Sequence, residues 1–182
     1  RRAFASESGK AILKEKVTIL HCTSCYPAPM ESVNLNAIQT LITKFNLPVG
    51  YSDHTLGAHV ATAAVAKGAS VIEKHITLDR TLPGPDHQAS MEPREFQAMV
   101  QQIRDIEVAL GDGIKKPHAL ELDTKLVARK SLVASQNLLK GQTLTLDMIR
   151  ATRPGDGQPP MDFWDLEGQV LTKNIAEGES VE

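Results

Sequence analysis

Two histidines that each follow a short apolar run are the residues whose type and spacing best suit chemistry. The runs at residues 47–51 and 69–72 flank an Ala-rich segment with helical spacing, and His54 and His75 come shortly after them. This order predicts a strand–helix–strand unit with an imidazole at the end of each strand. Functional sites of parallel α/β sheets lie beyond the carboxyl ends of the strands, so we expect the two imidazoles to share one metal ion.

The alternation of side chains along a strand supports this pairing. Ser52 shares a face with His54, and Glu73 shares a face with His75 and Thr77. If both faces point into one space, that space holds two imidazoles, a carboxylate and two hydroxyl groups. Imidazole nitrogen suits Zn, Mn, Fe or Co, and a site with few protein ligands leaves room for substrate. The alternative is that one or both are structural histidines at strand ends.

The elements that must position these residues alternate between apolar β-branched runs and segments of helical spacing. The predicted strands span residues 17–23, 47–54 and 69–77, and the predicted helices span residues 33–45, 57–67 and 93–110. Such alternation implies a parallel sheet. A (β/α)₈ barrel needs about 250 residues, so three units supply less than half of one. Asn34 or Asn36 is expected to cap the first of these helices, and Gly68 to end the second.

The pattern changes after Gly111. A polar connection leads to short segments that are separated by turns at residues 140–141, 154–155 and 177–178, which is typical of a small β-rich domain. We therefore expect a first domain over residues 1–115, a linker over residues 116–128 and a second domain over residues 129–182.

Composition and charge exclude several classes of function. The 182 residues are 41% hydrophobic and carry a formal net charge of −2, which does not favour binding to nucleic acid or an anionic membrane. No apolar run reaches the roughly 18 residues of a membrane span. The N-terminal segment lacks the apolar core of a secretory signal. We therefore expect a cytoplasmic protein with small-molecule substrates.

Cys22 and Cys25 form a C-x-x-C pair whose context argues against redox or zinc chemistry. A redox pair of this kind opens a helix, whereas the residues that follow here, YPAP, are typical of a turn. In an extended strand, side chains three residues apart point to opposite faces, so the two thiols are expected to diverge. A zinc site would need further thiols or nearby histidines.

Five segments together resemble a known family. They are HCTSCYPAP (21–29), GYSDHT (50–55), VIEKHITLDR (71–80), GPDHQAS (84–90) and ATRPGDG (151–157). In this order they resemble the N-acetylneuraminate (sialic acid) synthases and the related legionaminate and pseudaminate synthases. The resemblance implies an α/β fold in which the C-terminal portion of a TIM (β/α)₈ barrel precedes a small β-rich SAF (antifreeze-like, β-clip) domain. The segments match the last three strands of that barrel.

The resemblance also implies an activity. These synthases condense phosphoenolpyruvate with N-acetylmannosamine and water to give N-acetylneuraminate and phosphate. The alternatives are legionaminate or pseudaminate synthesis, or a non-catalytic fragment that binds carbohydrate or a partner. His54 and His75 would hold a divalent cation, Mn²⁺ before Mg²⁺ or Co²⁺, which acts as a Lewis acid on the aldehyde. Without the family's first five strands, the 182 residues alone are expected to be inactive.

Further site residues follow from the same resemblance. Tyr26 and Glu73 are assigned to catalysis: the resemblance places Tyr26 against the sugar, whereas Glu73 is assigned from its strand face, which it shares with His75 and from which it would tune the metal or move a proton. Ser24, which stands where some members have Asn, and Ser52 are assigned to phosphoenolpyruvate, and Asp86 to sugar hydroxyls. From the residues alone, Tyr26 also fits loop packing, Glu73 a salt bridge and Asp86 an ordinary turn.

Arg153 in the small domain is assigned to the N-acyl group of the sugar. In the resembling family this arginine comes from the partner chain, so the resemblance implies a homodimer in which each small domain reaches the other subunit's active site. An arginine head group carries two donors for an amide carbonyl, which Lys provides less well.

A different enzyme class would use His54, His75 and Asp53 as a two-His-one-carboxylate iron site. Asp53 directly precedes His54 and therefore has the wrong parity to share its face. The repeated strand–helix pattern is also unlike the folds of such oxygenases.

Overall fold

The computed structural model describes residues 2–181, and of residues 2 and 3 only the backbone. It divides into two compact units, Arg1–Ile114 and Lys115–Glu182. No helix among the described residues is long and apolar enough to cross a membrane.

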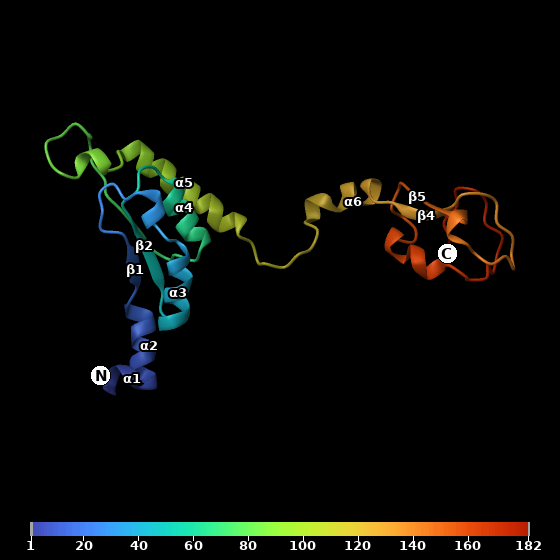
Figure 1. Ribbon diagram of the computed structural model, residues 1–182, viewed down its shortest axis with the longest axis horizontal. Helices are drawn as coiled ribbons and strands as arrows, with labels where there is room; N and C mark the ends of the chain where they lie inside the picture. Colours follow the sequence, from blue (N-terminus) through green and yellow to red (C-terminus); the bar gives the residue numbers. More distant parts are fainter. Residues whose placement is uncertain (1, 182) are drawn as a thin grey trace. The chain divides into compact units, whose positions relative to one another are not determined.

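The first unit is built on a three-stranded parallel sheet in the order β1-β2-β3. The strands are β1 (Ile19–Cys22), β2 (Val49–Asp53) and β3 (Ile72–Lys74), and the helices that follow them are α3 (Asn36–Phe45), α4 (His59–Ala66) and α5 (Pro93–Ala109). The helices lie along one side of the sheet (Figure 1). The predicted parallel α/β arrangement is confirmed, although each strand is shorter than the apolar run that predicted it.

Alternation along β2 separates a helix-facing side from an open side. Val49 and Tyr51 belong to an apolar cluster with Ile38, Val60 and Ala64 from the helices. A second cluster joins α4 to α5 and comprises Ala61, Val65, Met91, Met99 and Ile103. The helices thus cover one face of the sheet and leave the other face for Ser52 and the residues beside it.

Gly50 lies on that open face, where the strands approach closely. A Cβ at this position would lie 2.5 Å from Leu20 Cδ2 and 2.6 Å from the carbonyl oxygen of Val71. Both distances are well below van der Waals contact, so only glycine fits between β1 and β3 here.

The helix ends agree only partly with the sequence-based expectation. Gly68 (φ +96°) ends α4 in a Schellman motif, because its N–H donates to Val65 O and the N–H of Ala69 donates to Ala64 O. The predicted cap of α3 is wrong. Leu35 holds the N-cap position without a side-chain hydrogen bond. Asn34 instead adopts a left-handed conformation (φ 45°) just before it, which short polar side chains tolerate.

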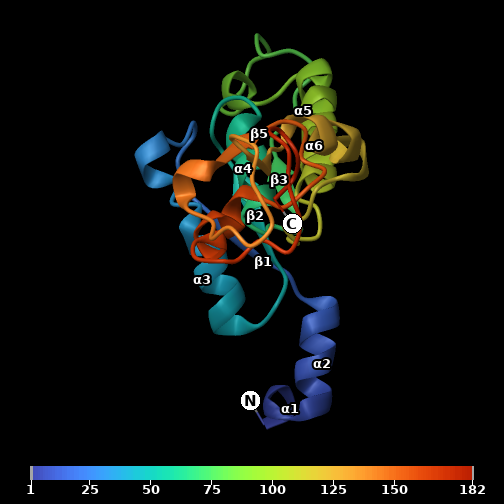
Figure 2. The same cartoon turned by 90° about the vertical axis from the view of Figure 1, so that its right-hand side faces the viewer.

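Two helices precede the sheet. They are α1 (Arg2–Ala5) and α2 (Glu7–Lys16), and Ser6 caps α2 by accepting a hydrogen bond from the N–H of Gly9. Figure 2 shows both helices beyond the amino end of β1, away from the carboxyl ends of the strands. A 3₁₀ turn, η1 (Met30–Ser32), lies in the loop after β1.

The second unit contains less regular strand than the sequence pattern predicts. Its sheet pairs β4 (Ser131–Ala134) with β5 (Ile149–Thr152) antiparallel, and three isolated bridges supplement it. Short 3₁₀ helices η4 (Leu146–Met148) and η5 (Pro160–Leu166) complete this part. Its core comprises Leu132, Ala134, Leu138, Leu144, Ile149, Leu166, Leu171, Ile175 and Val181.

The segment expected to be a linker is not wholly irregular. Residues 116–128 contain η3 (Ala119–Glu121) and α6 (Leu122–Ala128). The end of α6 contacts the loop after β5, because the N–H of Gly155 donates to Leu126 O over 3.0 Å. The helix carries three exposed apolar side chains, Leu122, Leu126 and Val127. The polar composition of the whole segment led to the prediction of a linker in place of this helix.

Tyr51 provides a test of the core beneath the sheet. Its side chain is fully buried, and its hydroxyl has no hydrogen-bond partner among the described residues. Burial, reinforced by the negative charge of Asp53, raises the pKa of Tyr51 from 10.0 to about 12. Below pH 10 the Tyr51 hydroxyl is protonated in both the folded and the unfolded state, so its ionisation does not lower the free energy of unfolding. Stability is lost as the pH rises to about 12, because there the unfolded state releases a proton that the folded state retains.

We expect the free energy of unfolding to fall less steeply between pH 10 and 12 in Tyr51→Phe than in the wild type, as measured by urea denaturation. At neutral pH the variant should be no less stable, because it removes a buried hydroxyl that has no partner. Equal pH dependence in the two proteins would contradict this account.

Candidate active site

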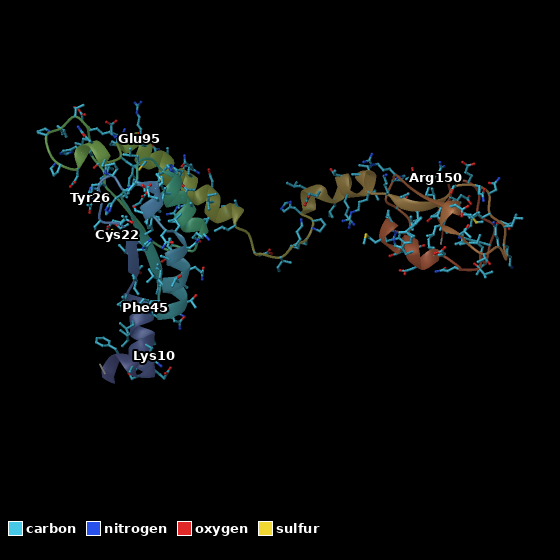
Figure 3. All side chains as sticks on the ribbon, in the orientation of Figure 1. Lys10, Cys22, Tyr26, Phe45, Glu95 and Arg150 are labelled. Carbon is cyan, nitrogen blue, oxygen red and sulfur yellow. The ribbon has the colours of Figure 1, made fainter. Side chains whose placement is uncertain are left out.

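Three aromatic rings meet at the carboxyl ends of the strands. The ring centroids of His54 and His75 are 5.3 Å apart with nearly perpendicular planes. Tyr26 lies 4.2 Å from His54 and 5.5 Å from His75, centroid to centroid. Figure 3 shows Tyr26 beyond β1, at the end of the sheet opposite to Phe45. The structure therefore brings together the two histidines predicted to share a metal and Tyr26, which was assigned to the sugar.

His54 is oriented by the loop that follows β1. Its Nδ1 lies 2.8 Å from the carbonyl oxygen of Thr23, and its own carbonyl accepts from the N–H of Ala28 over 2.9 Å. A carbonyl oxygen can only accept, so Nδ1 carries the proton, and in the neutral ring Nε2 keeps its lone pair. A backbone carbonyl in this role is the usual support of a metal-binding imidazole.

Cys22 lies beside His54, which the sequence reasoning missed. Its Sγ is 3.7 Å from His54 Nδ1, and both cysteines are free thiols. Cys22 pairs in register with Ser52, so strand parity already placed it on the open face once the register was known.

Ser52 and Glu73 form the polar part of the open face below the histidines. Ser52 Oγ donates to Glu73 Oε1 over 2.6 Å, as the shared parity of these residues on paired strands requires. Glu73 therefore has a hydroxyl partner here, in place of the salt bridge that its sequence also allowed. A carboxylate held in this way can accept or deliver a proton at a ligand above it.

The loop after β3 folds back beside His75. The N–H of Met91 donates to His75 O, and the N–H of Thr77 donates to Met91 O, each over 2.9 Å. A shallow hollow at this point is lined by His75, Ile76, Pro85, Asp86, His87 and Ser90. Asp86 thus lines the same hollow as His75, a predicted metal ligand.

His87 is a second residue that the sequence reasoning missed. Its Nδ1 lies 2.7 Å from Thr77 Oγ1, and Gly84 leaves space for its ring, because a Cβ there would lie 2.8 Å from His87 Cδ2. The sequence could have indicated His87, because it directly follows Asp86 in the GPDHQAS segment.

Two further residues were assigned to the site, one in each unit. Ser24 is exposed in the loop after β1. Arg153 is exposed in the second unit, where its Nε donates to the carbonyl oxygen of Ala128 over 2.9 Å.

Asp53 does not belong to the open face. Its carboxylate is buried and forms an ion pair with Lys74, Oδ2 to Nζ 2.8 Å. Its other oxygen accepts from both the N–H and the hydroxyl of Thr55. With both oxygens engaged on the helix-facing side, Asp53 cannot join His54 and His75 in a two-His-one-carboxylate iron site.

The described residues contain no group of three or more His, Cys, Asp or Glu side chains arranged to hold a metal ion. The two imidazoles nevertheless suit a divalent cation, because their ring centroids are only 5.3 Å apart and the hydrogen bond at Nδ1 leaves Nε2 of His54 unprotonated. Two protein ligands leave most coordination positions for water and substrate.

The chain belongs to the NeuB family. The family's model matches residues 3–115, and the model of the SAF domain matches residues 129–182. The chain is 48% identical over 166 residues to N,N'-diacetyllegionaminic acid synthase of Legionella pneumophila, which covers 91% of this chain and 47% of that protein. It is 47% identical over 168 residues to the Campylobacter jejuni enzyme of the same name, covering 92% and 50%. The chain therefore spans about half the length of these relatives.

Among solved structures, the chain resembles the N-acetylneuraminic acid (sialic acid) synthetase from Leptospira borgpetersenii, determined in complex with citrate. The TM-score is 0.55 and the sequence identity 44%, over 65% of this chain and 42% of that one. The predicted relationship to this family is thus confirmed.

The hydrogen bonds predict opposite tautomers for two histidines. His54 should carry its proton on Nδ1, whereas His118 should carry it on Nε2, because its Nδ1 accepts from the N–H of Leu120 over 3.2 Å. Long-range ¹H–¹⁵N spectra of the neutral rings distinguish the two forms, and His118 serves as the internal control. A proton on Nε2 of His54 would contradict the geometry described above.

Proposed function

We propose that the protein containing this chain is a phosphoenolpyruvate-dependent synthase of a nine-carbon sugar acid. In this reaction the methylene carbon of phosphoenolpyruvate forms a bond to the aldehyde carbon of an N-acyl hexosamine, water adds, and phosphate leaves. The observation that carries the proposal is the meeting of His54, His75 and Tyr26 at the carboxyl ends of parallel strands in a member of the NeuB family.

The sequence motifs alone made N-acetylneuraminate the first candidate for the product. The relatives favour legionaminate instead. Two N,N'-diacetyllegionaminic acid synthases match about nine tenths of the chain at 48% and 47% identity. The sialic acid synthetase matches 65% of the chain at 44% identity, which keeps N-acetylneuraminate synthesis as the second candidate.

In this proposal His54 and His75 hold a divalent cation, with Mn²⁺ expected before Mg²⁺ or Co²⁺. The cation supplies Lewis-acid polarisation of the aldehyde when bound. Tyr26 packs against the sugar beside His54, which its exposed ring makes possible. Glu73, oriented by the hydroxyl of Ser52, moves a proton at the substrate.

The remaining polar residues divide between the two substrates. Ser24 and Ser52 contact phosphoenolpyruvate, whose carboxylate and phosphate oxygens accept hydrogen bonds from hydroxyl groups. Asp86 binds sugar hydroxyls from the hollow beside His75. Arg153 contacts the N-acyl group.

We further propose how this chain fits into the enzyme. Residues 1–115 form the last three units of a TIM barrel, and residues 129–182 form a SAF domain, joined by residues 116–128. The protein is a cytoplasmic homodimer in which Arg153 reaches the active site of the partner. The limits of the two family models support this division of the chain.

The metal site is tested by His54→Ala and His75→Ala in the full-length protein. Each should abolish Mn²⁺-dependent release of phosphate, because each removes one of two protein ligands, while circular dichroism shows an intact fold. His118→Ala, which alters an exposed imidazole in the other unit, is the matched control. Near wild-type turnover of either site variant at limiting metal would contradict a shared ion.

The identity of the sugar is tested by competition between acceptors. A hexosamine with two acetamido groups should give a kcat/KM at least about tenfold above that of N-acetylmannosamine, because a site built for a second amide leaves polar groups unpaired when that amide is missing. Phosphate release and mass spectrometry of the product measure both reactions. The reverse preference would establish N-acetylneuraminate synthesis instead.

A further inference from the structure

The two candidate metal ligands are each adjacent in sequence to a residue of one buried polar network. Asp53 directly precedes His54, Thr55 directly follows it, and Lys74 directly precedes His75. The side chains of Lys74 and Asp53 are 1% and 0% exposed, and Thr55 is fully buried. We call these three residues the Asp53–Lys74–Thr55 network.

Most of the network's polar groups are engaged within it. Asp53 Oδ2 accepts from Lys74 Nζ over 2.8 Å, and Asp53 Oδ1 accepts from the N–H and hydroxyl of Thr55 over 2.9 and 2.8 Å. Lys74 Nζ also donates to the carbonyl oxygen of Thr55. Each residue therefore bonds to both of the others.

The network lies on the opposite side of the sheet from the imidazoles. Asp53 and Lys74 are direct partners in the parallel register of β2 and β3, and their successors in sequence turn to the open face. A bond between the two side chains consequently fixes how far apart the strands are just where both histidines leave them. Thr55 fixes the chain on the far side of His54.

Stability alone does not account for such a network. Removing a lysine and a carboxylate from water costs several kcal/mol per ion, and a buried pair is commonly replaceable by apolar residues at little cost in stability. What an apolar pair lacks is direction, since dispersion contacts do not fix the angle between groups as charge-assisted hydrogen bonds do.

We propose that Asp53, Lys74 and Thr55 are positioning residues that set the separation and orientation of His54 and His75. They touch neither substrate nor metal and act only through the backbone that they hold. This inference rests on the proposed function, in which the two imidazoles share a divalent cation.

The main test replaces the ion pair by apolar residues of similar size, in Asp53→Leu/Lys74→Met, within the full-length protein. The melting temperature should stay within a few degrees of the wild type. The affinity for Mn²⁺, measured by water proton relaxation, should fall by about tenfold or more, as is typical when the groups that orient metal ligands are removed. Mn²⁺ affinity equal to the wild type in the folded double variant would overturn the proposal.

A milder pair of variants decides the question if the double variant does not fold. Thr55→Val removes the hydroxyl that donates to Asp53, whereas Thr55→Ser retains it. Val should weaken Mn²⁺ binding several-fold and Ser should restore it, whereas equal affinities would overturn the proposal. Arg104→Ala, which breaks the exposed Arg104–Glu107 pair on α5, is the control and should leave affinity unchanged.

Imidazole NMR of the metal-free protein separates this proposal from the proposed function. The network variants should shift the ring signals of both His54 and His75 and leave His118 in place. If the wild type binds no Mn²⁺ but the ring signals still shift in the variants, the proposed metal site is wrong and the positioning role is supported. If the wild type binds Mn²⁺ and neither ring signal shifts, the positioning role is wrong and the metal site stands.

Discussion

The parallel register of β2 and β3 is the constraint on which the rest of the first unit depends. It places Asp53 opposite Lys74 and Ser52 opposite Glu73, so one register produces a buried ion pair on one face and a carboxylate–hydroxyl pair on the other. A shift by one residue would exchange the faces of every side chain on the strand. For β3, this shift would bury Glu73 among apolar helices and leave the buried carboxylate of Asp53 without Lys74. The histidines meet because this register is strongly specified.

Much of this arrangement could be predicted because it follows from short-range rules. Alternation along a strand placed Ser52 and Glu73 on one face, and a glycine after an Ala-rich helix predicted the end of α4. The meeting of His54 and His75 also required a parallel sheet, which the repeated strand–helix pattern indicated. The family's motifs added Tyr26, whose ring contact no rule of periodicity provides.

The parts that could not be predicted depend on contacts between distant residues. Asn34 or Asn36 was expected to cap α3, but the incoming loop turns at Asn34 in a left-handed conformation and leaves Leu35 at the cap, with Asn36 already inside the helix. The proximity of Cys22 to His54 depends on the register of β1 against β2. In the second unit, polar composition masked α6, and short apolar segments that are typical of strands form only single bridges outside β4 and β5.

Because the strands approach closely at Gly50, a substitution at this position affects β1 and β3 as well as β2. Leu20 could be replaced by a smaller residue to admit a Cβ at position 50, but the carbonyl oxygen of Val71 is backbone and has no smaller substitute. Any side chain at position 50 must therefore push β3 away from β2. The two strands carry one histidine each, so such a substitution would affect both metal ligands even though position 50 lies below them on the sheet. Because glycine has no side chain, it allows the close spacing of the strands, and this spacing sets the distance between the two histidines.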